Sequence, residues 1–242
     1  MSETTPPARF ENPCPFRFTR DQYYRLGELG FFGQLRVELL AGEIIEKYPD
    51  DPVDPSPRPF RFSREQFYRF GELGFFDGRR VELVLGEIVV TAPVSERHVA
   101  GVSLAADELK AAFGANYYVR VNAYLNLSVI DPVPDVAVVA GSPRNHCVPP
   151  TTALLIVEVA DTTLLNDTTT KAELYATAGV QDYWVIDIEH RLLHVFRDPQ
   201  ALPLPEDLGA TAYRTHLTLA PTDRVSPLAA PAASVLVSEL LP

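Results

Sequence analysis

The fold is decided by the stretch at residues 153–160, which reads Ala153-Leu154-Leu155-Ile156-Val157-Glu158-Val159-Ala160. A nearly continuous apolar run of this length is typical of a central β-strand that is covered on both faces. Glu158 lies inside the run, and burying an ionised carboxylate alone is strongly unfavourable. We therefore expect Glu158 to be paired, hydrogen-bonded or bound to a metal ion.

The segments on either side of this strand alternate between helical and extended periodicity. We expect helices over residues 95–113 and 168–178, strands over residues 117–127, 135–140, 183–187, 192–197 and 212–219, and a short element over residues 235–241. The central order is helix, three strands, helix and strand. This order indicates an α/β fold with a central mixed β-sheet flanked by helices.

An internal repeat precedes this region. Residues 15–44 align without gaps to residues 59–88, and 21 of the 30 aligned positions are identical. In each copy a capping box, at Thr19 and at Ser63, predicts a short helix, and the residues that follow predict a β-hairpin. Two copies are too few for a solenoid. We interpret the first copy as an arm that extends the sheet or covers its edge, with a separate functional unit as the alternative.

The length of 242 residues is enough for one large domain with an appendage. We expect four parts, namely a flexible N-terminus at residues 1–14, the first repeat copy at 15–49, a stiff Pro/Asp-rich linker at 50–58, and one α/β domain at 59–242 that includes the second copy.

Composition excludes several classes of protein. Apolar residues make up 46% of the chain and charged residues 22%, which rules out disorder along its whole length. We expect no membrane-spanning helix, because no run of about 18 apolar residues occurs, and no secretory signal. Two cysteines, Cys14 and Cys147, are too few for a disulfide framework and lack zinc-ligand spacing. These observations predict a cytoplasmic location.

Charge constrains the partners. With 21 basic and 32 acidic residues the net charge is −11, the wrong sign for passive attraction to DNA or to anionic lipid. We expect no membrane partner, and any contact with nucleic acid has to be local or assisted by a bound cation.

Three residues form a candidate catalytic set. Asp135 follows a proline where a loop enters an apolar strand, Glu158 lies in the central strand, and Lys171 lies near the start of the next helix. Two carboxylates from adjacent strands can hold a hard divalent cation such as Mg²⁺. A nearby lysine can orient the attacking hydroxide and stabilise developing negative charge. The set is typical of metal-assisted phosphodiester hydrolysis.

Each of these residues also has a purely structural alternative. Asp135 can be a turn residue, and Glu158 can form an ion pair with an arginine. Lys171 can be a solvated helix residue or can pair with Asp167, which lies four residues before it.

Several short motifs follow one another in an order known from a protein family. They are residues 82–89 (Glu-Leu-Val-Leu-Gly-Glu-Ile-Val), 134–139 (Pro-Asp-Val-Ala-Val-Val), 157–159 (Val-Glu-Val), Lys171 with 174–176 (Leu-Tyr-Ala) and 178–180 (Ala-Gly-Val), and 182–187 (Asp-Tyr-Trp-Val-Ile-Asp). In this order they resemble the Uma2 family, a bacterial family of the PD-(D/E)XK restriction-endonuclease-like superfamily. The resemblance extends from about residue 60 to residue 242.

The resemblance implies a restriction-endonuclease-like core for residues 59–242 and a metal ion, Mg²⁺ or Mn²⁺, as cofactor. Asp135 and Glu158 match the two acids of the family motif. The lysine that normally stands two residues after the second acid is replaced by Ala160, and Lys171 fits the family's relocated lysine. Glu87 matches a further family acid that would complete the metal shell.

Three residues are candidates for supporting roles. His98 matches a position where the family often has histidine, but it shares a helix face with Val102 and Leu109, which favours a core histidine over a ligand. Asp161 departs from the Ser-Pro-Ser type of turn found in similar proteins. It either accepts hydrogen bonds around the metal or marks drift away from activity. Asp167 is the third candidate.

The leading functional hypothesis is a Mg²⁺- or Mn²⁺-dependent endonuclease that acts on nucleic acid, with DNA expected over RNA. The main alternative is a catalytically inactive protein of the nuclease fold that serves as a binding or assembly module. Hydrolysis of another phosphodiester is chemically possible at the same site. A homodimer is a further possibility, because many enzymes of this fold act as dimers.

Overall fold

The computed structural model describes residues 13–48, 56–76, 78–84, 86–90, 94–127, 130, 132–201 and 211–242. The expected flexible N-terminus, apart from its last two residues, and most of the expected linker at 50–58 lie outside the described residues. The chain divides into two compact units, Met1–Pro93 and Val94–Pro242. The second repeat copy belongs to the first of these units, because it shares a core with the first copy, and not to the α/β unit as we expected.

The C-terminal unit contains a six-stranded mixed sheet in the order β12-β11-β10-β9-β8-β7. Its strands are β7 (Tyr117–Val121), β8 (Val136–Ala140), β9 (Leu155–Ala160), β10 (Asp182–Asp187), β11 (Leu192–Ala201) and β12 (Thr211–Leu219). β9 and β10 pair in parallel, and the other neighbours are antiparallel. Every residue of β9 is buried, as its apolar sequence predicts.

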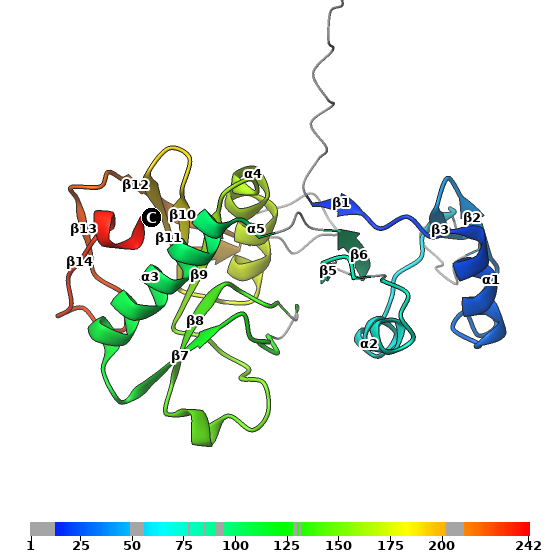
Figure 1. Ribbon diagram of the computed structural model, residues 1–242, viewed down its shortest axis with the longest axis horizontal. Helices are drawn as coiled ribbons and strands as arrows, with labels where there is room; N and C mark the ends of the chain where they lie inside the picture. Colours follow the sequence, from blue (N-terminus) through cyan, green and yellow to red (C-terminus); the bar gives the residue numbers. More distant parts are fainter. Residues whose placement is uncertain are drawn as a thin grey trace, which may run out of the picture. The chain divides into compact units, whose positions relative to one another are not determined.

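Helices cover both faces of this sheet (Figure 1). On one face lies α3 (Glu96–Phe113), and on the other lie α4 (Leu164–Thr168) and α5 (Thr170–Thr177). Side chains of β9 alternate between the two, so Val157 and Val159 pack with α3, whereas Ile156 and Ala160 pack with α5. The approach of α3 is close, because a Cβ atom at Gly101 would lie 2.9 Å from Cγ1 of Val159. The expected α/β fold with a central mixed sheet flanked by helices is therefore confirmed.

Short elements complete the C-terminal unit. The single turn η1 spans Pro143–Asn145, the two-stranded ladder pairs β13 (Arg224–Val225) with β14 (Val235–Leu236), and η2 spans Val237–Leu240. No helix in the described part of the chain has both the length and the apolar character needed to span a membrane.

Several predicted boundaries differ from the structure, and the strand expected over residues 192–197, for example, extends to Ala201. The strand expected over residues 117–127 ends at Val121, because Asn122 turns the chain with a positive φ of 46°. The helix expected over residues 168–178 is α5, which begins at Thr170, and the short helix α4 precedes it; Thr169 separates the two, because it leaves helical geometry at φ −118° and ψ −83°. The element expected over residues 235–241 is the strand β14 followed by η2.

In the N-terminal unit the two repeat copies fold alike. The first has β1 (Cys14–Pro15), α1 (Arg20–Glu28), β2 (Val37–Leu40) and β3 (Glu43–Glu46), and the second has β4 (Arg58–Pro59), α2 (Arg64–Glu72), β5 (Val81–Val84) and β6 (Glu87–Val90). The predicted capping boxes at Thr19 and Ser63 are both present. A single core rich in phenylalanine contains side chains from both copies.

Asp182 is an important buried charge in the C-terminal unit. It is 0% exposed, and its carboxylate accepts hydrogen bonds from Arg197 Nε, Trp184 Nε1 and the Leu228 backbone N–H, each at 2.8 Å. Its position at the start of β10 ties the central sheet to the C-terminal segment.

We predict that Asp182→Ala lowers the free energy of unfolding by about 3–5 kcal/mol, because it leaves the part-buried Arg197 guanidinium uncompensated. Urea denaturation followed by circular dichroism measures this change. The control is Asp107→Ala, which removes an exposed ion pair with Lys110 on α3 and should change stability by less than about 0.5 kcal/mol. Equal effects of the two substitutions would contradict the prediction.

Candidate metal and catalytic site

The register of two adjacent strands brings the two predicted acids together. β8 and β9 are antiparallel with Val136 opposite Val157, so the next residues along the ladder are Asp135 and Glu158. Asp135 Oδ2 accepts a hydrogen bond from the Val159 backbone N–H at 2.8 Å. Both carboxylates are buried, with relative exposures of 5% and 3%. Asp135 thus lies at the entrance of a strand, as the sequence predicts, but it is anchored to the neighbouring strand.

Helix α5 directs two polar side chains at Glu158. Lys171 Nζ lies 2.9 Å from Glu158 Oε2, and the Tyr175 hydroxyl donates to Glu158 Oε1 at 2.7 Å. Residues four apart share one helix face, so both donors reach the same carboxylate. Lys171 also lies 3.1 Å from Asp167 Oδ1, which makes the alternative pairing with Asp167 real as well. The lysine amine therefore points into the acidic cluster and not into bulk solvent.

His98 lies beside Asp135 at the start of α3. Its Nδ1 is 2.8 Å from the Val159 carbonyl oxygen, and its Nε2 is 3.2 Å from Asp135 Oδ1. A carbonyl oxygen can only accept, so Nδ1 carries a proton. A proton on Nε2 as well makes the ring an imidazolium opposite the ionised Asp135. In the structure His98 is therefore a polar partner of Asp135. Its position on the helix face had favoured a core histidine instead.

The environment shifts the pKa values of the two acids in opposite directions. Burial raises the pKa of Glu158 to about 8, and the negative charges of Asp135 and Asp167 add to this effect, while Lys171 and Tyr175 oppose it. Burial also acts to raise the pKa of Asp135. The hydrogen bond and charge of His98, together with the charge of Lys171 and the Val159 N–H, outweigh burial and leave that pKa below its ordinary value.

The donors in this cluster fit a hard divalent cation. Asp135, Glu158 and Asp167 are all buried carboxylates, and Mg²⁺ prefers carboxylate oxygens while keeping several waters. Among the described residues, no hydrogen-bond donor is aligned with Asp167 Oδ1, although the Lys171 amine is near it. No three His, Cys, Asp or Glu side chains in the described ranges form a ready-made metal cage. A cation here would take most of its ligands from water and substrate.

Two predicted residues have other partners. Asp161 accepts a hydrogen bond from the Ser95 hydroxyl at 2.6 Å and lies 3.7 Å from Arg97, so it joins the end of β9 to the start of α3. Glu87 belongs to the N-terminal unit, where it forms an ion pair with Arg61. The structure therefore brings together Asp135, Glu158, Lys171, Asp167 and His98.

Sequence reasoning missed two hydroxyl groups in the cluster. Tyr175 contacts Glu158, and the Thr163 hydroxyl donates a hydrogen bond to Asp167 Oδ2. The spacing of Tyr175, four residues after Lys171, is a signal that could have identified it. Thr163 carries no comparable signal, because its role depends on how the chain turns into α4.

Similarity to known proteins was found both in structure and in sequence. A crystal structure of "a putative nuclease belonging to DUF820 from Anabaena variabilis ATCC 29413" is 16% identical in sequence with a TM-score of 0.49, and the match covers 67% of this chain and 89% of that one. No curated protein matches the chain. A family model named Uma2 and described as "Putative restriction endonuclease" matches residues 64–234, which contain the whole acidic cluster. The chain therefore belongs to the Uma2 family and has a restriction-endonuclease-like fold.

Proposed function

We propose that the protein is a divalent-metal-dependent endonuclease that hydrolyses phosphodiester bonds of nucleic acid, with DNA as the expected substrate. The observation that carries the proposal is the meeting of the Lys171 amine with the buried Glu158 carboxylate next to Asp135. The family description as a restriction endonuclease supports the reaction class.

Each residue of the cluster would have a separate role in hydrolysis. Asp135, kept ionised by His98 and the Val159 N–H, and Glu158 would hold Mg²⁺ or Mn²⁺. A bound cation of this kind supplies a Lewis acid that acidifies water and neutralises phosphate charge. Lys171 would orient the attacking water and stabilise the negative charge that develops on the phosphate. Tyr175 holds Glu158 in place from the neighbouring turn of α5.

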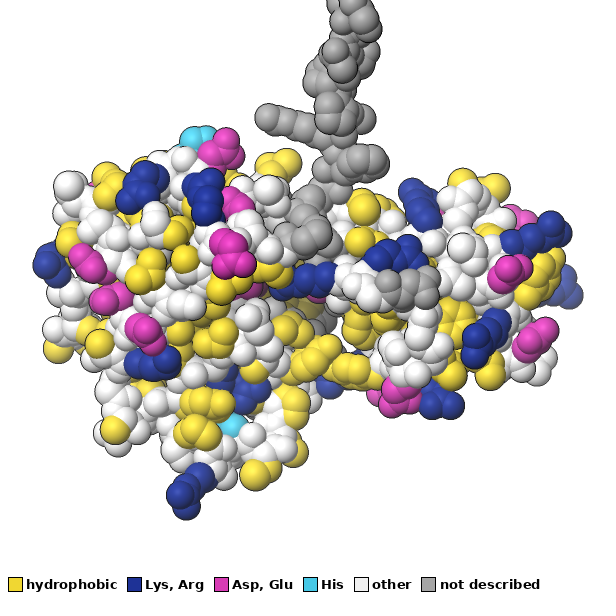
Figure 2. Space-filling model, viewed as in Figure 1, with side chains coloured by type: hydrophobic (Ala, Val, Ile, Leu, Met, Phe, Trp, Pro, Cys, Tyr) yellow, Lys and Arg dark blue, Asp and Glu magenta, His cyan; other side chains and the backbone are white. Residues whose placement is uncertain are grey.

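Attraction of nucleic acid would have to be local. The net charge is −11, and on the face in Figure 2 the described acidic and basic side chains are interspersed without a continuous basic patch. Long-range attraction of a polyanion is therefore weak. At the site itself a bound divalent cation, together with the Lys171 amine, would provide the favourable charge.

One observation favours a second candidate function, a catalytically inactive binding or assembly module. Every carboxylate oxygen of Asp135 and Glu158 already has a protein donor, from His98, Val159, Tyr175 or Lys171. A network satisfied in this way is stable without a metal ion. Cleavage assays separate the two candidates, because only the enzyme responds to a cation with hydrolysis.

We predict that the purified protein cleaves plasmid or single-stranded DNA only when Mg²⁺ or Mn²⁺ is added. Lys171→Ala and Glu158→Gln should each lower the rate about 100-fold or more, since each removes a group that stabilises the transition state. The control is Lys110→Ala, which removes an exposed lysine on α3 and should leave the rate unchanged. Equal cleavage by all variants would indicate contamination, and inactive wild-type protein would favour the binding module.

We predict that stability falls as pH rises between about 5 and 8. The ordinary pKa of Glu158 is 4.5 and the folded-state value is about 8, so between these values the folded protein keeps a proton that the unfolded chain has released. The free energy of unfolding then decreases by up to about 1.4 kcal/mol per pH unit. Glu158→Gln should flatten this slope in urea titrations at several pH values. An unchanged slope in the variant would contradict the assigned shift.

We also propose Glu87 as a supporting acid, on the basis of the family resemblance, and the repeat supplies a matched control. Glu43 is its counterpart in the first copy, and the two form equivalent ion pairs, Glu43 with Arg17 and Glu87 with Arg61. Glu87→Gln and Glu43→Gln should therefore change stability equally. If Glu87 supports the metal, Glu87→Gln alone lowers metal-dependent cleavage, by about 10-fold or more. Equal cleavage by both variants would remove Glu87 from the site.

A further inference from the structure

The two repeat copies contact each other reciprocally. β1 of the first copy pairs with β6 of the second, with Cys14 opposite Val90. β4 of the second copy pairs with β3 of the first, with Arg58 opposite Glu46. Equivalent residues of the two copies differ by 44 in number, so Cys14 corresponds to Arg58 and Val90 corresponds to Glu46. The two strand pairs are therefore equivalent. Each copy therefore gives the other the same strand that it receives.

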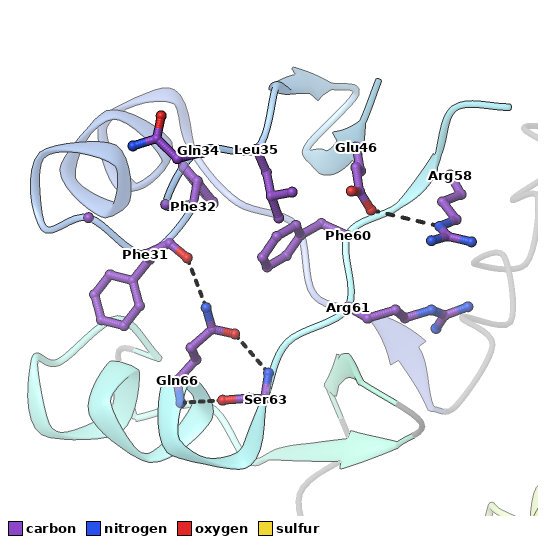
Figure 3. Close-up of a pocket in the computed structure, with 12 residues that line it drawn as sticks. Phe31, Phe32, Gln34, Leu35, Glu46, Arg58, Phe60, Arg61, Ser63 and Gln66 are labelled. Carbon is purple, nitrogen blue, oxygen red and sulfur yellow. Dashed lines mark hydrogen bonds and ion pairs between the residues drawn. The ribbon is translucent and has the colours of Figure 1, made fainter. Parts of the chain in front are cut away.

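Hydrogen bonds of side chains and backbone follow the same rule. Gln22 Nε2 donates to the Phe75 carbonyl oxygen at 2.8 Å, and its counterpart Gln66 Nε2 donates to the Phe31 carbonyl oxygen at 2.9 Å. Figure 3 shows the second of these bonds at a pocket of about 790 Å³ that is lined by residues of both copies. Both glutamines are the N3 residues of the capping boxes, so the side chain that helps to cap each helix also fixes that helix to the other copy.

A pseudo-twofold axis passes between two equivalent aromatic rings. Phe18 and its counterpart Phe62 contact each other with ring centroids 5.4 Å apart. A residue can touch its own equivalent only close to a twofold axis. On either side of the axis Phe16 packs on Phe76, and Phe32 packs on Phe60, each at 5.6 Å.

The segments that cross this axis are exchanged between the two copies. The Phe16 N–H donates to Ile88 in the other copy, whereas the Phe18 N–H donates to Gly42 in its own copy. Phe60 and Phe62 repeat this pattern with Ile44 and Gly86. Exchange of an identical element across a twofold axis is the arrangement of arm-exchanged homodimers. A single copy alone would expose a hairpin edge and an apolar face.

We propose that the N-terminal unit is a homodimerisation interface that has been fused into one chain. The surface of each repeat fits a second copy of the same repeat, and in this protein the second copy is supplied by the same chain. Both pairing surfaces are thereby occupied within one chain, so the intact chain does not dimerise through them. The inference is independent of the proposed nuclease activity.

A disulfide in the full chain tests whether the pairing is intramolecular. Val90→Cys places a thiol opposite the native Cys14, and paired strand residues of this kind are within disulfide range. Cys147→Ser removes the remaining thiol. Oxidation with diamide should give a single-chain product without free thiols, by mass spectrometry and non-reducing electrophoresis. A disulfide-linked dimer, or two thiols that stay free, would overturn the proposal. Val90→Cys with Cys14→Ser is the control that cannot form this bond.

A second experiment disrupts one copy in the full chain and so exposes the pairing surface of the other copy. Leu26→Asp with Ile44→Asp places two charges at buried positions of the first copy, and Phe70→Asp with Ile88→Asp does so at the equivalent positions of the second. The wild-type chain should sediment at its monomer mass of 26.8 kDa. Each double variant should shift toward twice this mass as its concentration rises, because the intact copy now pairs with another chain.

Fluorescence of Trp184, the single tryptophan, reports whether the C-terminal unit stays folded in these variants. A double variant that keeps native fluorescence and remains monomeric at every concentration would overturn the proposal. If a double variant loses native fluorescence, the disulfide experiment decides the question by itself.

Discussion

The structure of the C-terminal unit depends on how one buried carboxylate is satisfied. Glu158 lies in the central strand of the sheet with 3% relative exposure, where water cannot solvate it. Lys171 and Tyr175 on α5 both reach it, and this requirement sets the position of α5 against the sheet. A helix displaced by one turn would leave the carboxylate without donors, at a cost of several kcal/mol.

The same arrangement links stability to chemistry. The pKa of Asp135 is lowered by His98, and the pKa of Glu158 is raised by burial, so two neighbouring acids hold their protons differently at neutral pH. Pairs of acids separated in this way are common at functional sites, although structural ion-pair networks also produce them. His98, the Val159 N–H, Lys171 and Tyr175 contact the two carboxylates in this structure. A bound cation would have to share the carboxylates with these groups.

In the N-terminal unit the main constraint is a different one, because small sheets have open edges with unpaired backbone groups. A two-stranded hairpin is marginal by itself, and its edges invite pairing with other chains. In this protein each hairpin gains a third strand from the other copy, β1 on β6 and β4 on β3. Two small units that would be unstable alone thereby share one phenylalanine-rich core.

Much of this could be predicted from the sequence, because the signals are local. The apolar run at 153–160 contains the central strand β9, and the capping boxes at Thr19 and Ser63 begin their helices as predicted. The order of the motifs identified the Uma2 family. The two acids and the lysine of the cluster also follow from that order, together with the cost of burying a charge inside an apolar strand.

Tertiary structure alone decided the features that depend on contacts between distant residues. The partnership of His98 with Asp135 requires α3 to cross the end of β8, and no local pattern records that crossing. The pairing of the two repeat copies likewise depends on strand register across residues far apart in the chain. Periodicity reports which face of an element is apolar, but it does not report which element covers that face, because the partner is chosen by packing over the whole unit.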